Sequence, residues 1–252
     1  MTTVLRDYGR LGRIAIATPQ ANPTVEAEFA ILMPRQVSLH VTRLTSNAQL
    51  PADRLVQYLE KLGVALAAFD TFRPECVGFA CTGSSYLVGM ARETAILTTE
   101  SARSGVAIDT ATGAIRWVLD RLCARRIALI TPYPPFLATA AKQFWSDAGY
   151  AVMRDIRVNV GGADTRGIYD LCAADARPLL AGLNLDGVDA VLLSGTGLPS
   201  LPLIAEWNDG PPLLSSNLCL AARLLDRLGI ASGDPFPHPV NWRHRLNEAT
   251  TA

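Results

Sequence analysis

The chain has 252 residues, of which 49% are hydrophobic and 18% are charged, and its formal net charge is +0. A chain of this length and hydrophobicity can bury a core as one large domain or as two smaller lobes. The balanced charge, without a basic or acidic block, argues against nucleic acid and anionic membrane surfaces as partners.

Apolar runs typical of buried strands alternate along the chain with longer stretches of helical periodicity. Such alternation predicts parallel sheets with helices on both faces, and therefore an α/β fold. Ligands of such folds bind beyond the carboxyl ends of the strands. In chain order we expect a strand at 14–17, a helix at 25–33, a strand at 38–44, a helix at 52–72, a strand at 77–80, a helix at 87–103, a short strand at 106–108, a helix at 114–122, a strand at 127–130, a helix at 136–148, a strand at 150–158, a helix at 168–183, a strand at 191–193, a helix at 199–208, a short strand at 213–214 and a helix at 218–228.

The two ends of the chain differ in character. The first residues lack the apolar run of a signal peptide, and no apolar stretch approaches the roughly 20 residues that span a bilayer. We therefore expect a soluble, cytoplasmic protein. At the other end, Pro235, Pro237 and Pro239 are expected to prevent a regular helix in 232–252, which we interpret as a tail packed on the surface or partly disordered.

Three segments recur in the same order in the two halves of the chain, which indicates two copies of one fold unit. We expect a first lobe over 1–112, completed by 218–252, and a second lobe over 113–217. The paired segments are 13–19 with 126–132, 77–83 with 191–197, and 119–122 with 225–228.

The expected buried strands end in loops rich in hydroxyls, glycine and amides and poor in charge. Such loops present hydroxyl and backbone N–H groups, and a following helix N-terminus favours an anion. They predict a cradle for a carboxylate more than for a phosphate, because neither phosphate-binding glycine motif is present. The loops are 18–22, 81–85, 131–133 and 195–197, with 109–112 and 215–217 as further candidates.

Cys81 is the strongest candidate for chemistry. It ends a buried strand just before a helix, where placement at the helix N-terminus lowers the pKa of a thiol and favours a nucleophile or proton shuttle. The alternative is a small buried residue that ends the strand. The five cysteines form no C-x-x-C pair, so we expect free thiols without zinc. The other four are interpreted as core residues: Cys76, Cys123, Cys172 and Cys219.

The remaining candidates each have two interpretations. Tyr133 could donate a hydrogen bond to an oxyanion, or wedge between the lobes. Asn22 and Asn217 could bind a carboxylate, or serve turns. Asp109 could touch the substrate, but we favour a helix cap. No histidine lies in the candidate loops, which argues against Ser–His–Asp or Cys–His catalysis and against a metal site.

Several of these stretches together resemble the aspartate/glutamate racemase superfamily, and most closely its arylmalonate decarboxylase and maleate cis–trans isomerase branch. The resemblance extends from about Gly12 to Leu228. It implies two pseudo-symmetric lobes, each a four-stranded parallel sheet flanked by helices, with the active site in the cleft between them. The stretches that carry it are 14–26, 81–82, 131–133, 192–198 and 215–217.

The sequence departs from the family pattern at one position. Racemases and maleate isomerases of this family carry one cysteine after the equivalent strand of each lobe. Here the first is Cys81, and the second position reads Gly195. Arylmalonate decarboxylases keep a single cysteine in the second lobe, with glycine in the first. This chain has the mirror arrangement, and one-sided proton delivery fits decarboxylation.

The resemblance therefore implies a cofactor-independent decarboxylase of a substituted malonate-type dicarboxylate. In this hypothesis Thr82 and Tyr133 stabilise the enediolate left by loss of CO₂, and Cys81 protonates it. We expect substrate binding by the following residues: Asn22, Gly83, Ser84, Ser85, Gly195, Thr196, Gly197, Ser216 and Asn217.

Three alternatives remain open. A maleate-type isomerase would use the Cys81 thiolate to add to a double bond, and the stretches 19–26 and 216–217 resemble the isomerases more than the decarboxylases. One-base racemisation is the second alternative. The third is a protein that binds a small carboxylate without turnover. The oligomeric state is also open, a homo-oligomer included.

Overall fold

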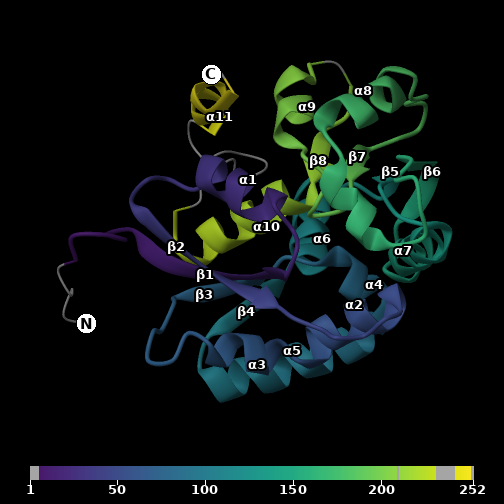
Figure 1. Ribbon diagram of the computed structural model, residues 1–252. Helices are drawn as coiled ribbons and strands as arrows, with labels where there is room; N and C mark the ends of the chain where they lie inside the picture. Colours follow the sequence, from purple (N-terminus) through teal and green to yellow (C-terminus); the bar gives the residue numbers. More distant parts are fainter. Residues whose placement is uncertain (1–5, 209, 231–241, 251–252) are drawn as a thin grey trace.

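The computed structural model describes residues 6–208, 210–230 and 242–250, and its core is formed by two four-stranded parallel sheets (Figure 1). The α/β fold expected from the alternating pattern is confirmed. The first sheet has the order β2-β1-β3-β4, from β1 (Gly12–Pro19), β2 (Val37–Leu44), β3 (Cys76–Phe79) and β4 (Ala107–Thr110). The second has the equivalent order β6-β5-β7-β8, from β5 (Arg126–Thr131), β6 (Ala151–Arg157), β7 (Ala190–Leu193) and β8 (Leu213–Ser215).

The central strands owe their place to unbroken apolar runs. Every residue of β3 and β7 is buried, and β1 and β5 are buried over nearly their whole length. A strand covered on both faces must be apolar at successive positions, whereas an edge strand can alternate. β6 alternates between exposed and half-buried residues and lies at the edge of its sheet.

Helices cover both faces of the first sheet. α1 (Thr24–Leu32) and α10 (Ser216–Arg227) lie on one face, and α3 (Leu62–Ala67) and α5 (Met90–Ser104) lie on the other (Figure 1). α10 follows β8 of the second sheet but packs against β3 and β4 of the first. The exact division of the chain into lobes stays a prediction.

The two sheets are joined through packed helices. α4 (Thr82–Val88) contacts α2 (Pro51–Glu60) in the first half and α7 (Pro135–Asp147) in the second. α6 (Ala111–Arg121) contacts both β4 and α10, while α8 (Ala173–Ala181) contacts α9 (Leu201–Glu206). Because α4 begins directly after Cys81, the candidate cysteine lies where the two halves meet.

Three helices expected as single elements are each divided in the structure. The helix expected at 52–72 breaks at Lys61 into α2 and α3. The helix expected at 87–103 is preceded by α4, and Gly89, with φ of +78°, separates α4 from α5. The helix expected at 168–183 is replaced by a 3₁₀ helix, η1 (Thr165–Asp170), followed by α8. Helical periodicity continues through such breaks, so a pattern search joins the pieces.

The expectation for 232–252 is wrong in part. Residues 242–250 form a regular helix, α11 (Trp242–Thr250), whereas Pro235, Pro237 and Pro239 lie outside the described residues. α11 packs against α1 and α9 (Figure 1). Trp242 and Leu246 are buried one helical turn apart, so an apolar stripe docks the helix.

Asp109 and two cysteines also differ from expectation. The cap of α6 is Thr110, whose side chain accepts from Gly113 N. Asp109 instead pairs with Arg223 and Arg227 of α10. Cys123 and Cys172 are exposed rather than part of the core, whereas Cys76 and Cys219 are buried as expected.

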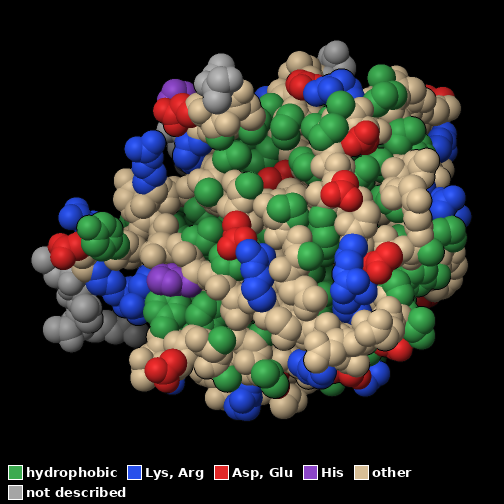
Figure 2. All heavy atoms as spheres, in the orientation of Figure 1, with side chains coloured by type: hydrophobic (Ala, Val, Ile, Leu, Met, Phe, Trp, Pro, Cys, Tyr) green, Lys and Arg blue, Asp and Glu red, His purple; other side chains and the backbone are tan. Residues whose placement is uncertain are grey.

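The visible surface mixes charges of both signs. Figure 2 shows Lys and Arg side chains interspersed with Asp and Glu, in keeping with the balanced composition. Within the described ranges, no helix is both long enough and apolar enough to cross a bilayer.

Candidate active site

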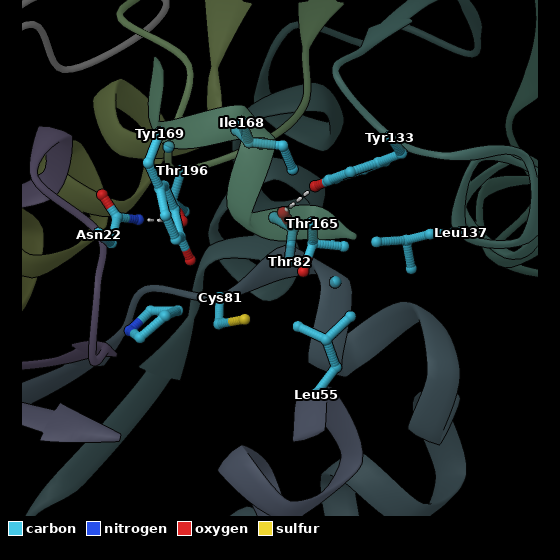
Figure 3. A pocket seen from close by; sticks show the side chains of 14 residues that line it. Asn22, Leu55, Cys81, Thr82, Tyr133, Leu137, Thr165, Ile168, Tyr169 and Thr196 are labelled. Carbon is cyan, nitrogen blue, oxygen red and sulfur yellow. Dashed lines mark hydrogen bonds between the residues drawn. The ribbon is translucent and has the colours of Figure 1, made fainter. Parts of the chain in front are cut away.

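A pocket lies beyond the carboxyl ends of the central strands, where loops from both sheets meet (Figure 3). It contains about 340 Å³ of empty space, part of it open to solvent. No residue in its lining carries a charge. The lining residues are Pro19, Asn22, Leu55, Cys81, Thr82, Gly83, Tyr133, Leu137, Thr165, Ile168, Tyr169, Gly195, Thr196 and Gly197.

Cys81 lies in the pocket as the residue that precedes α4, with extended backbone. The Ser84 hydroxyl donates to its sulfur, with Oγ 3.1 Å from Sγ. Burial raises the pKa of the Cys81 thiol, while hydrogen bonds from the Ser84 side chain and from the backbone N–H groups of Ser84 and Gly83 act in the opposite direction. The resting thiol is therefore protonated, and its environment contains donors that would support a thiolate.

Gly195 occupies the position equivalent to Cys81 in the other half. The last residues of β3 and β7 pair with equivalent residues of β1 and β5, and Cys81 and Gly195 each lie two positions further along. Gly195 has φ of +144°, and a Cβ there would lie 2.8 Å from Pro132 Cγ and 3.5 Å from the Tyr133 hydroxyl oxygen. The backbone and its neighbours thus exclude a side chain at the place of a second thiol.

Tyr133 and Thr82 form the polar wall on that side. The Tyr133 hydroxyl oxygen is 2.5 Å from Thr82 Oγ1, and both side chains are almost fully buried. Burial is the main cause that raises the pKa of Tyr133 well above its ordinary value, and the nearby Tyr86 is the second cause. Tyr133 is therefore a neutral phenol and can donate a hydrogen bond.

The opposite polar wall joins the two halves of the chain. Asn22 Nδ2 donates to Thr196 Oγ1 at 3.2 Å, and Thr196 Oγ1 donates to the Ala80 carbonyl at 3.0 Å. Thr24 Oγ1 donates to the Gly197 carbonyl at 2.9 Å. These bonds fix the loop after β7 against the loop after β1 (Figure 3).

A buried carboxylate supports this wall from behind. Glu28 accepts from Asn217 Nδ2 at 2.7 Å and from the Leu201 N–H at 3.0 Å, and Asn217 also donates to the Thr196 carbonyl at 3.0 Å. Burial raises the pKa of Glu28, and the hydrogen bonds from Ser200, Asn217 and Leu201 oppose this effect. The group bridges α1, α9 and α10, and so positions the Thr196 loop.

The remaining side of the pocket is largely apolar. Leu55 comes from α2, Leu137 from α7 and Ile168 from η1. Figure 3 shows Leu55 and Leu137 on one side of Cys81, with Asn22 and Thr196 on the other. A carboxylate would be solvated poorly on the apolar side, whereas an apolar substituent or a departing CO₂ would fit there.

η1 is held over the pocket by Arg54 of α2. Arg54 is 2% exposed, pairs with Asp164 and donates to Thr165 Oγ1 at 3.2 Å. Asp164 also accepts from the Arg166 backbone N–H and so begins η1. This ion pair fixes the lining residues that η1 contributes.

The structure brings together most of the predicted site. Eight of the predicted residues line the pocket, while four lie behind it and not in the lining. Of these, Ser84 contacts the Cys81 sulfur and Ser85 donates to Glu93 Oε1 at 2.6 Å. Ser216 accepts from the Gly195 N–H at 3.0 Å, and Asn217 binds Glu28. These four residues follow the expected strands, but they belong to the first turns of α4 and α10, and their side chains point into the protein rather than into the pocket.

The residues missed by sequence reasoning come mainly from the segments after β2 and β6. They are Leu55, the η1 residues Thr165, Ile168 and Tyr169, and in addition Pro19 at the end of β1 and Leu137 of α7. The repeat indicates that segments after equivalent strands approach the same cleft, but it does not indicate which of their side chains face it. In the described part of the chain, no group of three or more His, Cys, Asp or Glu side chains is placed to hold a metal ion.

Comparison with known proteins gives consistent relatives in sequence. No protein-family model matches the chain. It is 27% identical over 235 residues to a maleate isomerase of Nocardia farcinica, covering 88% of this chain and 92% of that one. It is 23% identical over 240 residues to a maleate isomerase of Pseudomonas putida, covering 88% of this chain and 93% of that one.

Solved structures share the fold. The maleate isomerase of Pseudomonas putida with maleate has a TM-score of 0.78 at 20% identity, covering 87% of this chain and 92% of that one. A variant of the Nocardia farcinica isomerase with a covalently bound succinylcysteine intermediate has a TM-score of 0.76 at 23% identity, covering 87% and 93%. Arylmalonate decarboxylase has a TM-score of 0.63 at 21% identity, covering 88% and 93%.

These matches favour the isomerase alternative over the decarboxylase that the single cysteine suggested, because the sequence relatives described above carry the isomerase name. They also agree with the two equivalent four-stranded sheets. The similarity in sequence and in fold supports the resemblance to the branch of the aspartate/glutamate racemase superfamily that contains the maleate isomerases and arylmalonate decarboxylase.

Proposed function

We propose that the chain is a cofactor-independent cis–trans isomerase of maleate-type dicarboxylates in which Cys81 is the nucleophile. The observation that carries this proposal is the position of Cys81 in the pocket between the sheets, in a chain similar to maleate isomerases over most of its length. The isomerase reaction is inferred from the relatives, and the role of Cys81 is inferred from the geometry of the pocket.

The reaction needs one covalent bond to form and break. The Cys81 thiol first gives its proton to solvent. The thiolate then adds to one alkene carbon, and the π electron pair moves to the other carbon and its carboxylate as an enediolate. Rotation about the resulting single bond places the carboxylates trans. The electron pair then restores the double bond and the thiolate leaves, so no redox partner is needed.

The pocket supplies polar groups for both ends of such a substrate. Asn22 and Thr196 stand on one side of Cys81, and Thr82 and Tyr133 are placed to donate to the oxygens where the enediolate charge develops. A covalently bound succinylcysteine intermediate in the Nocardia farcinica variant is consistent with addition of a cysteine to the substrate in that relative.

The test is the conversion of maleate followed by proton nuclear magnetic resonance, with mass spectrometry of the quenched protein. We expect fumarate to appear. Acid quenching protonates the enediolate carbon, so we also expect a succinyl adduct on the peptide that contains Cys81. The test variant is Cys81→Ala, and Cys219→Ala is its matched control, because Cys219 is buried and does not line the pocket. Turnover without any requirement for Cys81 would contradict the proposal.

Decarboxylation of a substituted malonate is the second candidate. It is favoured by the apolar side formed by Leu55, Leu137 and Ile168, and by the protonated resting state of Cys81. The same assay with an arylmalonate in deuterated water distinguishes the two reactions. A deuterated monoacid product, together with no conversion of maleate, would replace the isomerase proposal.

A further inference from the structure

A row of buried polar side chains runs from the aromatic core to the pocket. Trp145 Nε1 donates to the Tyr86 hydroxyl at 3.1 Å, and the Tyr86 oxygen lies 2.5 Å from Ser194 Oγ. The Ser194 side chain also acts on the Tyr133 hydroxyl, because a hydrogen bond from Ser194 opposes the rise in the pKa of Tyr133, and the Tyr133 oxygen lies 2.5 Å from Thr82 Oγ1. Each of the five side chains is at most 5% exposed.

The first member gives the row a direction. An indole N–H can only donate, so Trp145 occupies a lone pair of the Tyr86 oxygen. Because the indole cannot accept, Ser194 is the partner available to the Tyr86 hydrogen, and in this arrangement the Ser194 hydrogen is directed to Tyr133. Tyr133 and Thr82 have two hydroxyl hydrogens between them, and their mutual bond uses one. The other is left to point into the pocket.

We propose that Trp145 and Tyr86 are positioning residues that orient the Tyr133–Thr82 pair as a hydrogen-bond donor to the enediolate oxygens. The proposal rests on the proposed isomerase function. Neither positioning residue lines the pocket. The polar route to the pair passes through Ser194, while the Tyr86 ring also meets the Tyr133 ring edge-on, with centroids 6.0 Å apart.

The direction of hydrogen-bond donation matters because the same hydroxyls can also donate in the reverse order. Without the indole N–H, Thr82 could donate to Tyr133, Tyr133 to Ser194, and Ser194 to Tyr86. The pair would then present lone pairs to the pocket, and these repel an oxyanion. Buried rows of hydroxyls polarise one another in a low-dielectric interior, so one fixed end biases the whole row.

The row also compensates for the missing thiol. It passes through Ser194, directly before Gly195, and the Tyr133 oxygen lies 3.5 Å from where a Cβ at position 195 would be. The Tyr133 hydroxyl therefore lies beside the position that the glycine leaves without a side chain, and its bond to Thr82 connects that position to the residue next to Cys81.

The test begins with Trp145→Phe, which keeps an aromatic ring and removes the N–H. We expect kcat on maleate to fall about tenfold and KM to rise by less, because the donor acts mainly on charge that develops during reaction. Phe144→Leu is the matched control. Phe144 also packs on Tyr86, with ring centroids 5.2 Å apart, but its ring makes no hydrogen bond. Its kcat should stay within about twofold of wild type.

A double-mutant cycle separates orientation from packing. Ser194→Ala cuts the row, so Trp145→Phe in that background should change kcat by less than about twofold. An equal loss in both backgrounds would overturn the proposal, as would an unchanged kcat in folded Trp145→Phe. If Trp145→Phe does not fold, Tyr86→Phe replaces it. That variant keeps the aromatic ring and removes the hydroxyl that contacts Ser194.

A binding measurement keeps this test independent of the proposed reaction. Calorimetry with succinate, a saturated dicarboxylate, should show affinity about threefold weaker in Trp145→Phe and no further change in the Ser194→Ala background. Wild type that binds succinate with this pattern but does not convert maleate would refute the isomerase and leave the row standing. Unchanged succinate affinity together with unchanged kcat would refute the row.

Discussion

The loops after β3 and β7 occupy equivalent places in the two sheets but have opposite properties. The first presents Cys81, with donors around its sulfur, and the second presents Gly195, with a backbone that only glycine adopts readily. In a symmetric frame, the cysteine of the pocket lining therefore lies on one side. The comparison teaches that the second loop could not hold a thiol without rearrangement, because Pro132 occupies the space that its Cβ would need.

The largest effect is expected when the thiol of the first loop is removed. Cys81→Ala removes the only thiol in the pocket lining, so turnover of maleate should fall by at least about 10³-fold. Initial rates by ultraviolet absorbance measure this loss, and thermal unfolding checks that the variant remains folded. Residual activity within about tenfold of wild type would move the nucleophile elsewhere.

The pH dependence sharpens the role of the same side chain. Burial raises the pKa of Cys81 above the ordinary value of about 8.5. If the thiolate attacks, kcat/KM should rise about tenfold per pH unit through neutral pH and level off only above that value. A rate that is flat at neutral pH and falls in alkaline solution would instead identify Cys81 as a proton donor.

The smallest effect is expected from restoring symmetry with Gly195→Cys. The variant should not gain activity, and it should lose about 2 kcal/mol of stability through backbone strain and contact with Pro132. Gly149→Ala is the control, because Gly149 has φ of +86° with nothing near its would-be Cβ and so reports strain alone. Denaturant unfolding measures both. Faster turnover at unchanged stability would mean that the loop readily accepts a second thiol.

The sequence predicted two copies of one fold unit from its repeat, and its family resemblance implied two four-stranded sheets with a cleft between them. It could not separate α4 from α5, because helical periodicity alone carries no sign of the turn at Gly89. It also placed Ser84 and Asn217 in contact with substrate. Their direction depends on the phase of the helices that begin at Thr82 and Ser216, which loop composition does not contain.

The apolar side of the pocket was beyond sequence reasoning for a different reason. Leu55 looks like any buried residue of an amphipathic helix, and only the packing of α2 beside α4 brings it to the pocket. The η1 residues are placed by the ion pair of Arg54 with Asp164, a long-range contact without a local pattern. The row from Trp145 to Thr82 is likewise visible only in three dimensions.

The position of α10 has a consequence for how the protein is made. Strand β3, which leads to Cys81, is covered by this late helix: a Cβ at Gly78 would lie 2.9 Å from Leu224 and 3.2 Å from Leu220. During synthesis from the N-terminus, β3 leaves the ribosome long before residues 216–227 do. One face of β3 therefore stays uncovered until the whole second sheet has been translated, and the half of the molecule that contains Cys81 is completed only by residues made later.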